Sequence, residues 1–155
     1  MDAEDIFSAQ GQALRDRAKA ITGKQLTLAL KGRLGVVIDG TGKDYAKIKD
    51  NVDQFRAVGY AVHMIFVNTD LDTALERNKM RPRSLEDGLV TKMWKDVQKN
   101  IGKFQGLFRN RLIVVDNSKG SDVERATVDA YKKIKTWAAK APENAMAIKW
   151  IKGQK

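Results

Sequence analysis

Three short apolar runs in this sequence are each followed by polar residues suited to binding phosphate. The runs cover residues 34–38, 61–67 and 112–115, and the polar stretches that follow them cover residues 39–43, 68–70 and 116–118. Apolar runs of this length are typical of buried parallel strands, whose carboxyl ends meet at one edge of a sheet. Each polar stretch alone is more typical of an ordinary turn. Together the three favour a phosphate-binding crevice, with Asp39 placed to sit beside Mg²⁺.

A second candidate site is the arginine-rich segment 76–83. Arg77 and Arg81 are four residues apart, on one face of a predicted helix end, and Arg83 follows the helix-breaking Pro82. Guanidinium groups suit the charge that spreads over a phosphoryl group during transfer. A solvated loop is the alternative, but three arginines in seven residues around a break favour a phosphate role.

The sequence excludes several common kinds of active site. A Walker A loop needs a glycine, four further residues, a Gly-Lys pair and then Ser or Thr. The pair Gly42-Lys43 fails this test because position 37 is Val and position 44 is Asp, and the pairs at 23–24 and 102–103 precede Gln and Phe. With no cysteine and one histidine, the chain has no disulfide framework, thiolate catalysis or His-based zinc site.

The charge balance favours an anionic partner. The 155 residues hold 29 Lys and Arg against 19 Asp and Glu, a net charge of +10. Two blocks, residues 76–111 and 131–155, each carry +6. Such blocks favour phosphate groups or a nucleic-acid backbone, although a solvated helix face explains the second block equally well. Apolar runs fall well short of a membrane span and no export signal is visible, so we expect a soluble cytoplasmic protein.

Helical patterns alternate with the apolar runs. Apolar spacing predicts helices at residues 8–31, 45–58, 89–108 and 123–138, and Gly59 is expected to end the second. Capping boxes that begin at Thr69, Ser84 and Ser121 predict three helix starts. His63 is expected to be a packed or rim residue. Strands alternating with helices predict an α/β fold with a mostly parallel sheet.

The motifs in their order resemble a kinase family. The run GRLGVVIDGTGKDYAKI, then GYAVHMIFVNTDLDTALERNKMRPR, then LIVVDNS is similar to the latter part of zeta-toxin-like and polynucleotide-kinase-like P-loop kinases. The resemblance covers most of the chain up to about residue 120. It implies a three-layer parallel sheet of P-loop kinase type. It also implies transfer of the γ-phosphate of ATP or GTP, with Mg²⁺, to a hydroxyl of a nucleotide, sugar or polynucleotide.

The resemblance also implies site residues. Asp5 corresponds to the aspartate that accepts the proton of the substrate hydroxyl, and Asp39 lies near metal and substrate. Arg77 and Arg81 correspond to lid arginines that clamp the nucleotide phosphates. The residues implied in nucleotide or substrate binding are Thr41, Lys43, Arg83, Asp116 and Asn117.

One departure from the family is large. The family's phosphate-cradling strand and loop have no counterpart in these 155 residues, and in the family that strand lies between those corresponding to 34–38 and 61–67. We expect an incomplete kinase-like domain over residues 1–140, followed by a basic appendage over 141–155. A partner chain supplies the central strand, the remaining strands close up, or the sequence is a fragment whose first part lies elsewhere.

Three functions follow as hypotheses. The first is a phosphotransferase, or the carboxy-terminal part of a split or truncated one, which is expected to be inactive alone without a P-loop. The second is a non-catalytic kinase-like module whose basic surface binds nucleic acid or a protein assembly. In a third version, an exposed sheet edge accepts a strand from a partner.

Overall fold

The computed structural model describes residues 8–154, in two compact units that divide after Gly40. In the first unit, helix α1 spans Ala9–Lys31. Its N-cap is Ser8, whose side chain accepts a hydrogen bond from the Gly11 N–H at 3.0 Å. The helix predicted at residues 8–31 is therefore confirmed.

The strand predicted at residues 34–38 is not formed. Residues 34–40 have no regular secondary structure, and α1 is the one regular element in the described part of this unit. A strand needs a neighbouring strand to satisfy its backbone groups, and the unit supplies none. Leu34, Val37 and Ile38 of the run are consequently exposed, Val37 by 97%.

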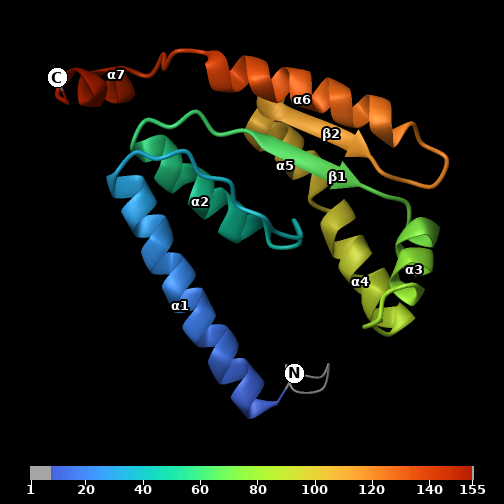
Figure 1. Cartoon of the computed structure of the whole chain (residues 1–155). Coiled ribbons are helices and arrows are strands. Elements are labelled where there is room, and N and C mark those ends of the chain that lie inside the picture. Colours follow the sequence, from blue (N-terminus) through green and yellow to red (C-terminus); the bar gives the residue numbers. More distant parts are fainter. Residues whose placement is uncertain (1–7, 155) are drawn as a thin grey trace. The chain divides into compact units, whose positions relative to one another are not determined.

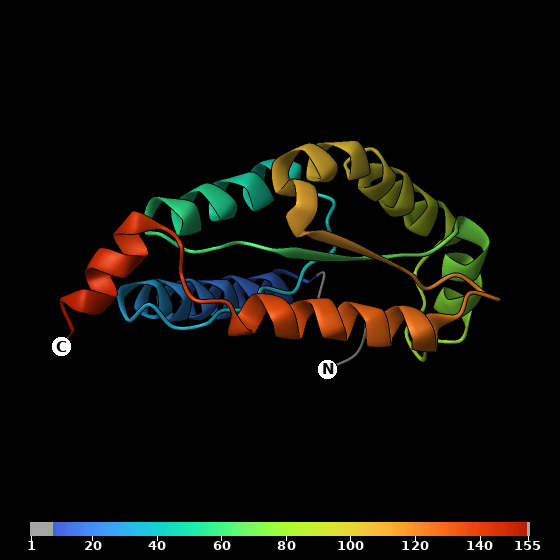
Figure 2. The same ribbon diagram turned by 90° about the horizontal axis from the view of Figure 1, so that it is seen from above.

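A two-stranded parallel sheet organises the second unit. Strand β1, Met64–Asn68, pairs with β2, Leu112–Asp116, and Met64 lies opposite Leu112. The strands predicted at 61–67 and 112–115 are thus confirmed, the first with a later start. Helices cover both faces of the sheet, with α6 on one face and α2 and α5 on the other (Figures 1 and 2). The fold class is α/β, as predicted.

Helices α2 and α6 lie where the apolar spacing predicts them, α3 follows the predicted capping box at Thr69, and α7 was not predicted. The predicted helix at 89–108 is two helices, interrupted at Lys99 and Asn100. The remaining bounds are α2, Tyr45–Ala57; α3, Leu71–Lys79; α4, Asp87–Gln98; α5, Ile101–Phe108; the 3₁₀ turn η1, Arg109–Arg111; α6, Val123–Ala139; and α7, Ala145–Lys152.

The core consists of two clusters, one on each face of the sheet. Phe104 of α5 is fully buried and packs with Phe66 of β1 and Val52 of α2. On the other face, Ile113 and Val115 pack against Ala130 of α6. This division follows from the alternation of side chains along a strand. Strand β2 thus contributes to both clusters, whereas the apolar residues of β1 that join a cluster, Met64 and Phe66, belong to the first one.

Gly59 fixes two features of this unit. It follows the end of α2 with φ +93°, a conformation that favours glycine. A Cβ on Gly59 would also lie 2.9 Å from the Ala147 N of α7, so only glycine allows this close approach. The basic appendage therefore packs against the connection between α2 and β1.

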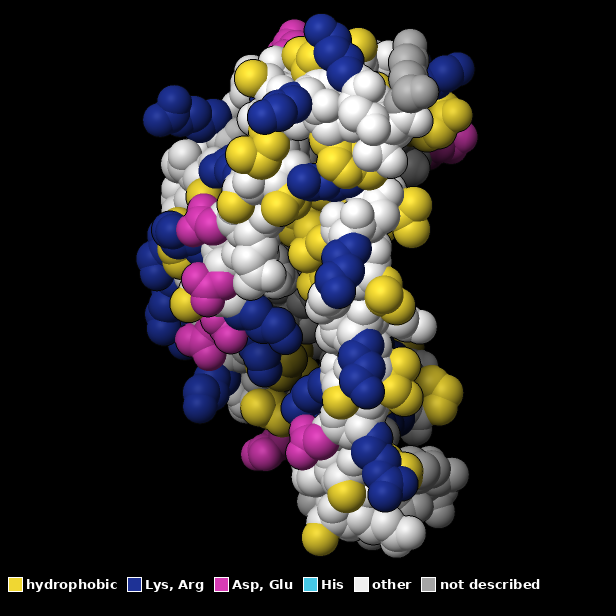
Figure 3. Space-filling view, turned by 90° about the vertical axis from the view of Figure 1, so that its left-hand side faces the viewer, with side chains coloured by type: hydrophobic (Ala, Val, Ile, Leu, Met, Phe, Trp, Pro, Cys, Tyr) yellow, Lys and Arg dark blue, Asp and Glu magenta, His cyan; other side chains and the backbone are white. Residues whose placement is uncertain are grey.

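The surface is rich in basic side chains. On the face in Figure 3, basic side chains are more frequent than acidic ones. Among residues 8–154, no helix is long and apolar enough to cross a membrane.

Candidate functional site

The carboxyl ends of the two strands lie side by side, and the loops that follow them are joined. The Asn117 N–H donates to the Asn68 carbonyl at 2.7 Å, which extends the pairing beyond the sheet. The Thr69 hydroxyl then donates to the Asn117 carbonyl at 3.3 Å. Two of the three predicted polar strand ends are therefore in contact.

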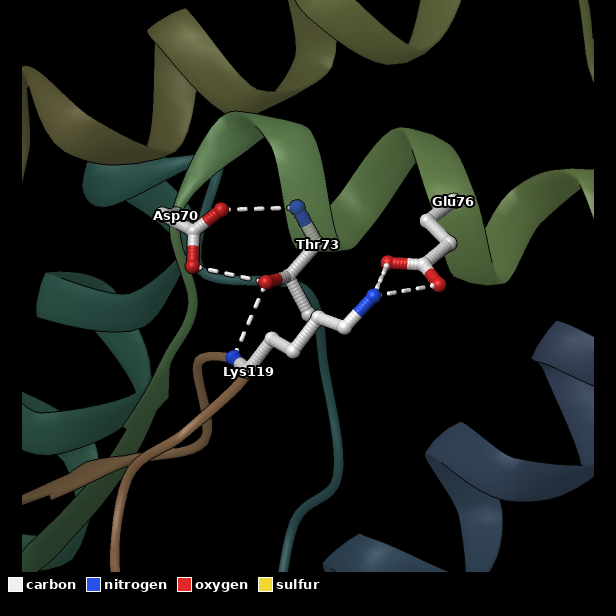
Figure 4. Close-up of polar contacts among 4 residues, drawn as sticks. All are labelled: Asp70, Thr73, Glu76 and Lys119. Carbon is white, nitrogen blue, oxygen red and sulfur yellow. Dashed lines mark hydrogen bonds and ion pairs between the residues drawn. The ribbon is translucent and has the colours of Figure 1, made fainter.

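Asp70 begins helix α3 at this edge. Its carboxylate accepts hydrogen bonds from the Thr73 N–H and the Thr73 hydroxyl, both at 2.7 Å (Figure 4). These two bonds, and a weaker one from Ser118, lower the pKa of Asp70 to about 2. The carboxylate is therefore ionised at neutral pH, which makes it a helix cap and a poor proton acceptor.

Lys119 ties the loop after β2 to the same helix. Its backbone N–H donates to the Thr73 hydroxyl oxygen at 3.0 Å, and its Nζ lies 2.9 and 3.0 Å from the two carboxylate oxygens of Glu76 (Figure 4). Thr73 is 4% exposed, so its hydroxyl links Asp70 to the second loop inside the protein. The sequence reading missed Thr73, although it lies three residues after a capping aspartate.

Asp116 and Asn117, both predicted site residues, lie at the end of β2. The hydroxyl and the backbone N–H of Ser118 hold the pKa of the Asp116 carboxyl below its usual value. Ser118 also bridges to the other loop, because its hydroxyl oxygen accepts a hydrogen bond from the Asp70 N–H at 3.0 Å. This edge thus carries two ionised carboxylates in a preformed frame.

A buried asparagine holds the segment that contains Thr41 and Lys43. The Asn100 side-chain amide donates to the Gly42 and Lys43 carbonyls at 3.1 and 2.9 Å, and Asn100 is 5% exposed. Gly42 has φ +75°, which favours glycine. Asn100 lies at the interruption between α4 and α5, in the N-cap position of α5, and its side chain anchors this loop in place of capping the helix.

The predicted lid arginines lie on α3 and on the loop after it. Arg77 is in the last turns of α3, while Arg81 and Arg83 follow its end at Lys79. The buried Asn78 closes this loop, since its side chain donates to the Leu85 carbonyl at 2.7 Å and accepts from the Leu85 N–H at 2.9 Å. Both Arg77 and Arg81 are exposed, and neither forms an ion pair with another described residue.

Helix α4 supports the end of β1 from one side. The Trp94 indole N–H donates to the Thr69 carbonyl at 2.8 Å, and the Gln98 amide donates to the Asn68 side chain at 2.8 Å. The strand end is therefore held by contacts from α4 as well as from the loop after β2.

The predicted catalytic residues Asp5 and Asp39 are not part of the strand-end site described above. Asp5 is outside the described residues. Asp39 belongs to the first unit, whereas Thr41 belongs to the second. Within residues 8–154, no three acidic or histidine side chains are grouped so that they could hold a metal ion.

Comparison with known proteins identifies the family. A family model described as an AAA domain matches residues 3–103. The matched region includes the loop held by Asn100, strand β1, helix α3 and the arginine loop. No curated protein and no solved structure matches the chain. Because the match covers more than half of its length, the chain belongs to this AAA-domain family of P-loop NTPase-like, kinase-related proteins.

Proposed function

We propose that this chain is part of a P-loop kinase-type phosphotransferase. The reaction transfers the γ-phosphate of ATP or GTP to a hydroxyl of a nucleotide, sugar or polynucleotide, as in the zeta-toxin-like and polynucleotide-kinase-like kinases it resembles. The proposed kinase-like domain covers residues 1–140 and has a three-layer architecture built around a parallel sheet. Residues 141–155 form the basic appendage. Asp5 is the proposed base, and Asp39 and Thr41 are proposed to lie near the substrate.

The arginines in the last turn of α3 and in the loop after it support this proposal best. Arg77 and Arg81 form no ion pair within residues 8–154, and the base of the loop beside them is fixed by Asn78. Helix α3 begins at the carboxyl end of β1, where ligands bind in open α/β sheets, and Arg77 lies in its last turn with Arg81 just after it. We propose that they and Arg83 bind the nucleotide phosphates, with Lys43, Asp116 and Asn117 at the same edge.

The P-loop is proposed to come from outside these 155 residues. The sequence contains no Walker A motif. Within the described residues β1 pairs with β2 alone, so its other edge has no strand beside it. Ile65 and Val67 of β1 are 47% and 59% exposed. A strand from a partner chain would pair with the free backbone groups of this edge.

The proposal does not depend on a metal site built by this chain. Mg²⁺ accompanies nucleotides in this family, but the described residues hold no carboxylate cluster that fits it. The frame of Asp70 and Asp116 is occupied by hydrogen bonds to Thr73 and Ser118. These carboxylates therefore organise the loops, and the arginines supply the charge that phosphates require.

A nucleotide-binding experiment tests the proposal. The full chain is titrated with a fluorescent ATP analogue, and we expect weak binding, on the order of millimolar, because the backbone cradle is missing. Replacing both Arg77 and Arg81 with Ala should weaken it at least five-fold. Arg125→Ala, which removes an exposed cation from α6, is the control and should change the affinity less than two-fold. Equal losses, or no binding at 10 mM, would contradict the proposal.

Activity provides a separate test. We expect the chain alone to show no measurable phosphoryl transfer, because the β- and γ-phosphates lack the P-loop lysine. Robust ATP hydrolysis by the purified chain would refute this expectation.

Helix α6 favours a second function, binding to nucleic acid or a protein assembly. Lys133 and Lys135 are exposed and form no ion pair with another described residue, whereas Lys132 lies 3.7 Å from Asp129. Binding through these lysines would weaken steeply as salt rises from 50 to 200 mM. Lys133→Glu with Lys135→Glu should abolish it. Binding that ignores both salt and these charges would exclude this function.

A further inference from the structure

We propose a second anion-binding site in this protein, a cavity lined by Arg56, Arg109 and Arg111 that binds phosphate-rich ligands. The cavity has a volume of about 400 Å³. This lies in the range of small-ligand sites, about 300–1,000 Å³. No acidic residue contributes to its lining.

The cavity is separate from the strand-end site. Arg111 immediately precedes β2, whereas the strand-end site follows Asp116 at the other end of the same strand. Five residues of strand place the two ends roughly 15 Å apart. A phosphate group bound in the cavity therefore contacts none of the residues in the proposed nucleotide site.

Three elements bring the guanidinium groups together. Arg56 lies in the last turn of α2, and its Nη2 donates to the Leu107 carbonyl of α5 at 2.9 Å. That bond uses one of the five N–H groups of the guanidinium and leaves the others for a ligand. It also satisfies a carbonyl at the end of α5, which would otherwise repel an anion.

Arg109 has a backbone conformation that arginine rarely adopts. It ends α5 with φ 52° and ψ −122°, in the region that favours glycine. This conformation begins the 3₁₀ turn in which Arg109 and Arg111 both line the cavity. Backbone strain of this kind is often found where a ligand site requires a particular geometry.

The positive charge in the cavity is not neutralised. None of the three arginines forms an ion pair with another described residue. Glu143 is the acidic group that Arg111 influences, since Arg111 makes a small contribution to lowering its pKa. That carboxylate is already held by Lys140, at 2.7 Å. An anion would therefore supply the missing counter-charge.

The lining favours phosphate over a nucleic-acid base. Its one aromatic residue, Phe108, is 4% exposed and belongs to the core, so it offers no ring for stacking. Guanidinium groups bind phosphate oxygens with paired hydrogen bonds. The cavity thus fits neighbouring phosphate groups, either the pyrophosphate of a free small molecule or successive phosphodiesters of a polynucleotide.

Backbone amide NMR of the full chain tests this site directly. Inorganic pyrophosphate and a single-stranded oligonucleotide without terminal phosphate are titrated separately. We expect shifts at residues 106–111 with at least one of them. A response to pyrophosphate identifies a small-molecule site, and a response to the oligonucleotide alone identifies a polynucleotide site. Absence of shifts at these residues with both probes would overturn the proposal.

Variants separate this site from the strand-end site. Arg109→Gly with Arg111→Gln removes two charges, and glycine adopts φ 52° without strain, so the fold should be retained. We expect at least a ten-fold loss of affinity measured at residues 106–111. Arg77→Ala with Arg81→Ala removes the same charge and should alter this affinity less than two-fold. Equal losses in both double variants would indicate non-specific attraction and overturn the proposal.

Discussion

His63 is the single histidine of the chain, and its ring stacks on Trp137 of α6 with centroids 4.1 Å apart. Its Nδ1 is buried with no hydrogen-bond partner among the described residues. Burial, and then the positive charge of Arg111, lower the pKa of His63 below 6.5. The residue is therefore a packed histidine, as expected from the sequence, and it is neutral at physiological pH.

This lowered pKa predicts how stability depends on pH. Between the folded pKa and 6.5 the unfolded chain binds the proton more readily than the folded one. The contribution to stability is thus fully present above pH 6.5 and decreases as the pH falls below it. The pKa of Asp70, about 2, lies well below this window. Urea unfolding from pH 7.5 to 5 should show a falling midpoint, and His63→Phe should flatten this dependence.

NMR titration of the ring provides the direct measurement. With one histidine in the chain, its ring signals are unambiguous. A measured pKa at or above 6.5 would contradict the assigned burial. A pH dependence that is unchanged in His63→Phe would show that another group causes it.

Thr73 supports a second prediction at the scale of single residues. Its buried hydroxyl donates to Asp70 and accepts from the Lys119 N–H. Valine has a similar shape but leaves both partners unsatisfied, so Thr73→Val should lower the free energy of unfolding by about 1–3 kcal/mol. Chemical denaturation measures this loss. Thr127→Val, at an exposed hydroxyl of α6, is the control. This variant should change the free energy of unfolding by about 0.5 kcal/mol or less. Similar effects would contradict the role of Thr73.

At the scale of elements, Asn78 is the residue on which the arginine loop depends. Its side chain forms both hydrogen bonds to Leu85 and is 5% exposed. Asn78→Ala should destabilise the protein by about 2–3 kcal/mol, because the Leu85 N–H and carbonyl lose their partners. Hydrogen exchange at the Leu85 amide should accelerate more than at the β1 amides. Gln54→Ala, on an exposed position of α2, should leave both measurements unchanged. If hydrogen exchange at the Leu85 amide is unaltered in Asn78→Ala, Asn78 does not hold the arginine loop closed.

Helix positions could be predicted well from apolar spacing, but helix starts could not. Thr69 and Ser121 were expected as caps, and each true N-cap, Asp70 and Asp122, lies one residue later. A capping box identifies the residues that could cap a helix. Which of them becomes the N-cap depends on the contacts at the end of the preceding strand. Thr69 instead donates to the Asn117 carbonyl, a contact between segments 48 residues apart.

Long-range partners also explain the other failures at this scale. The apolar pattern of residues 89–108 continues through Asn100, so it contains no sign of a break. The break follows from the Asn100 side chain, which binds carbonyls more than fifty residues away. Residues 34–38 likewise have the composition of a strand, but strand formation depends on a neighbour that composition does not specify. Apolar periodicity therefore predicts local elements, while side-chain contacts decide where they end.

For the whole molecule, the charge surplus is unevenly divided between the two units. The second unit carries nine of the ten surplus positive charges. The ion pairs among the described residues are exposed at both ends, by at least 41%. Pairs of this kind contribute little to stability. Repulsion among the surplus cations should therefore be the larger electrostatic effect on folding.

This balance predicts that salt stabilises the protein. Raising NaCl from 20 to 300 mM shortens the screening length and weakens the repulsion among the cations of the second unit. We expect the thermal midpoint, followed by circular dichroism, to rise by about 2–4 °C, which corresponds to about 1 kcal/mol for a chain of this size. Lys133→Glu with Lys135→Glu lowers the net charge and should reduce the rise. A midpoint that falls with NaCl would show that the exposed ion pairs outweigh the repulsion. Pyrophosphate at matched ionic strength should raise it further, because binding at the arginine cavity stabilises the folded state beyond screening alone.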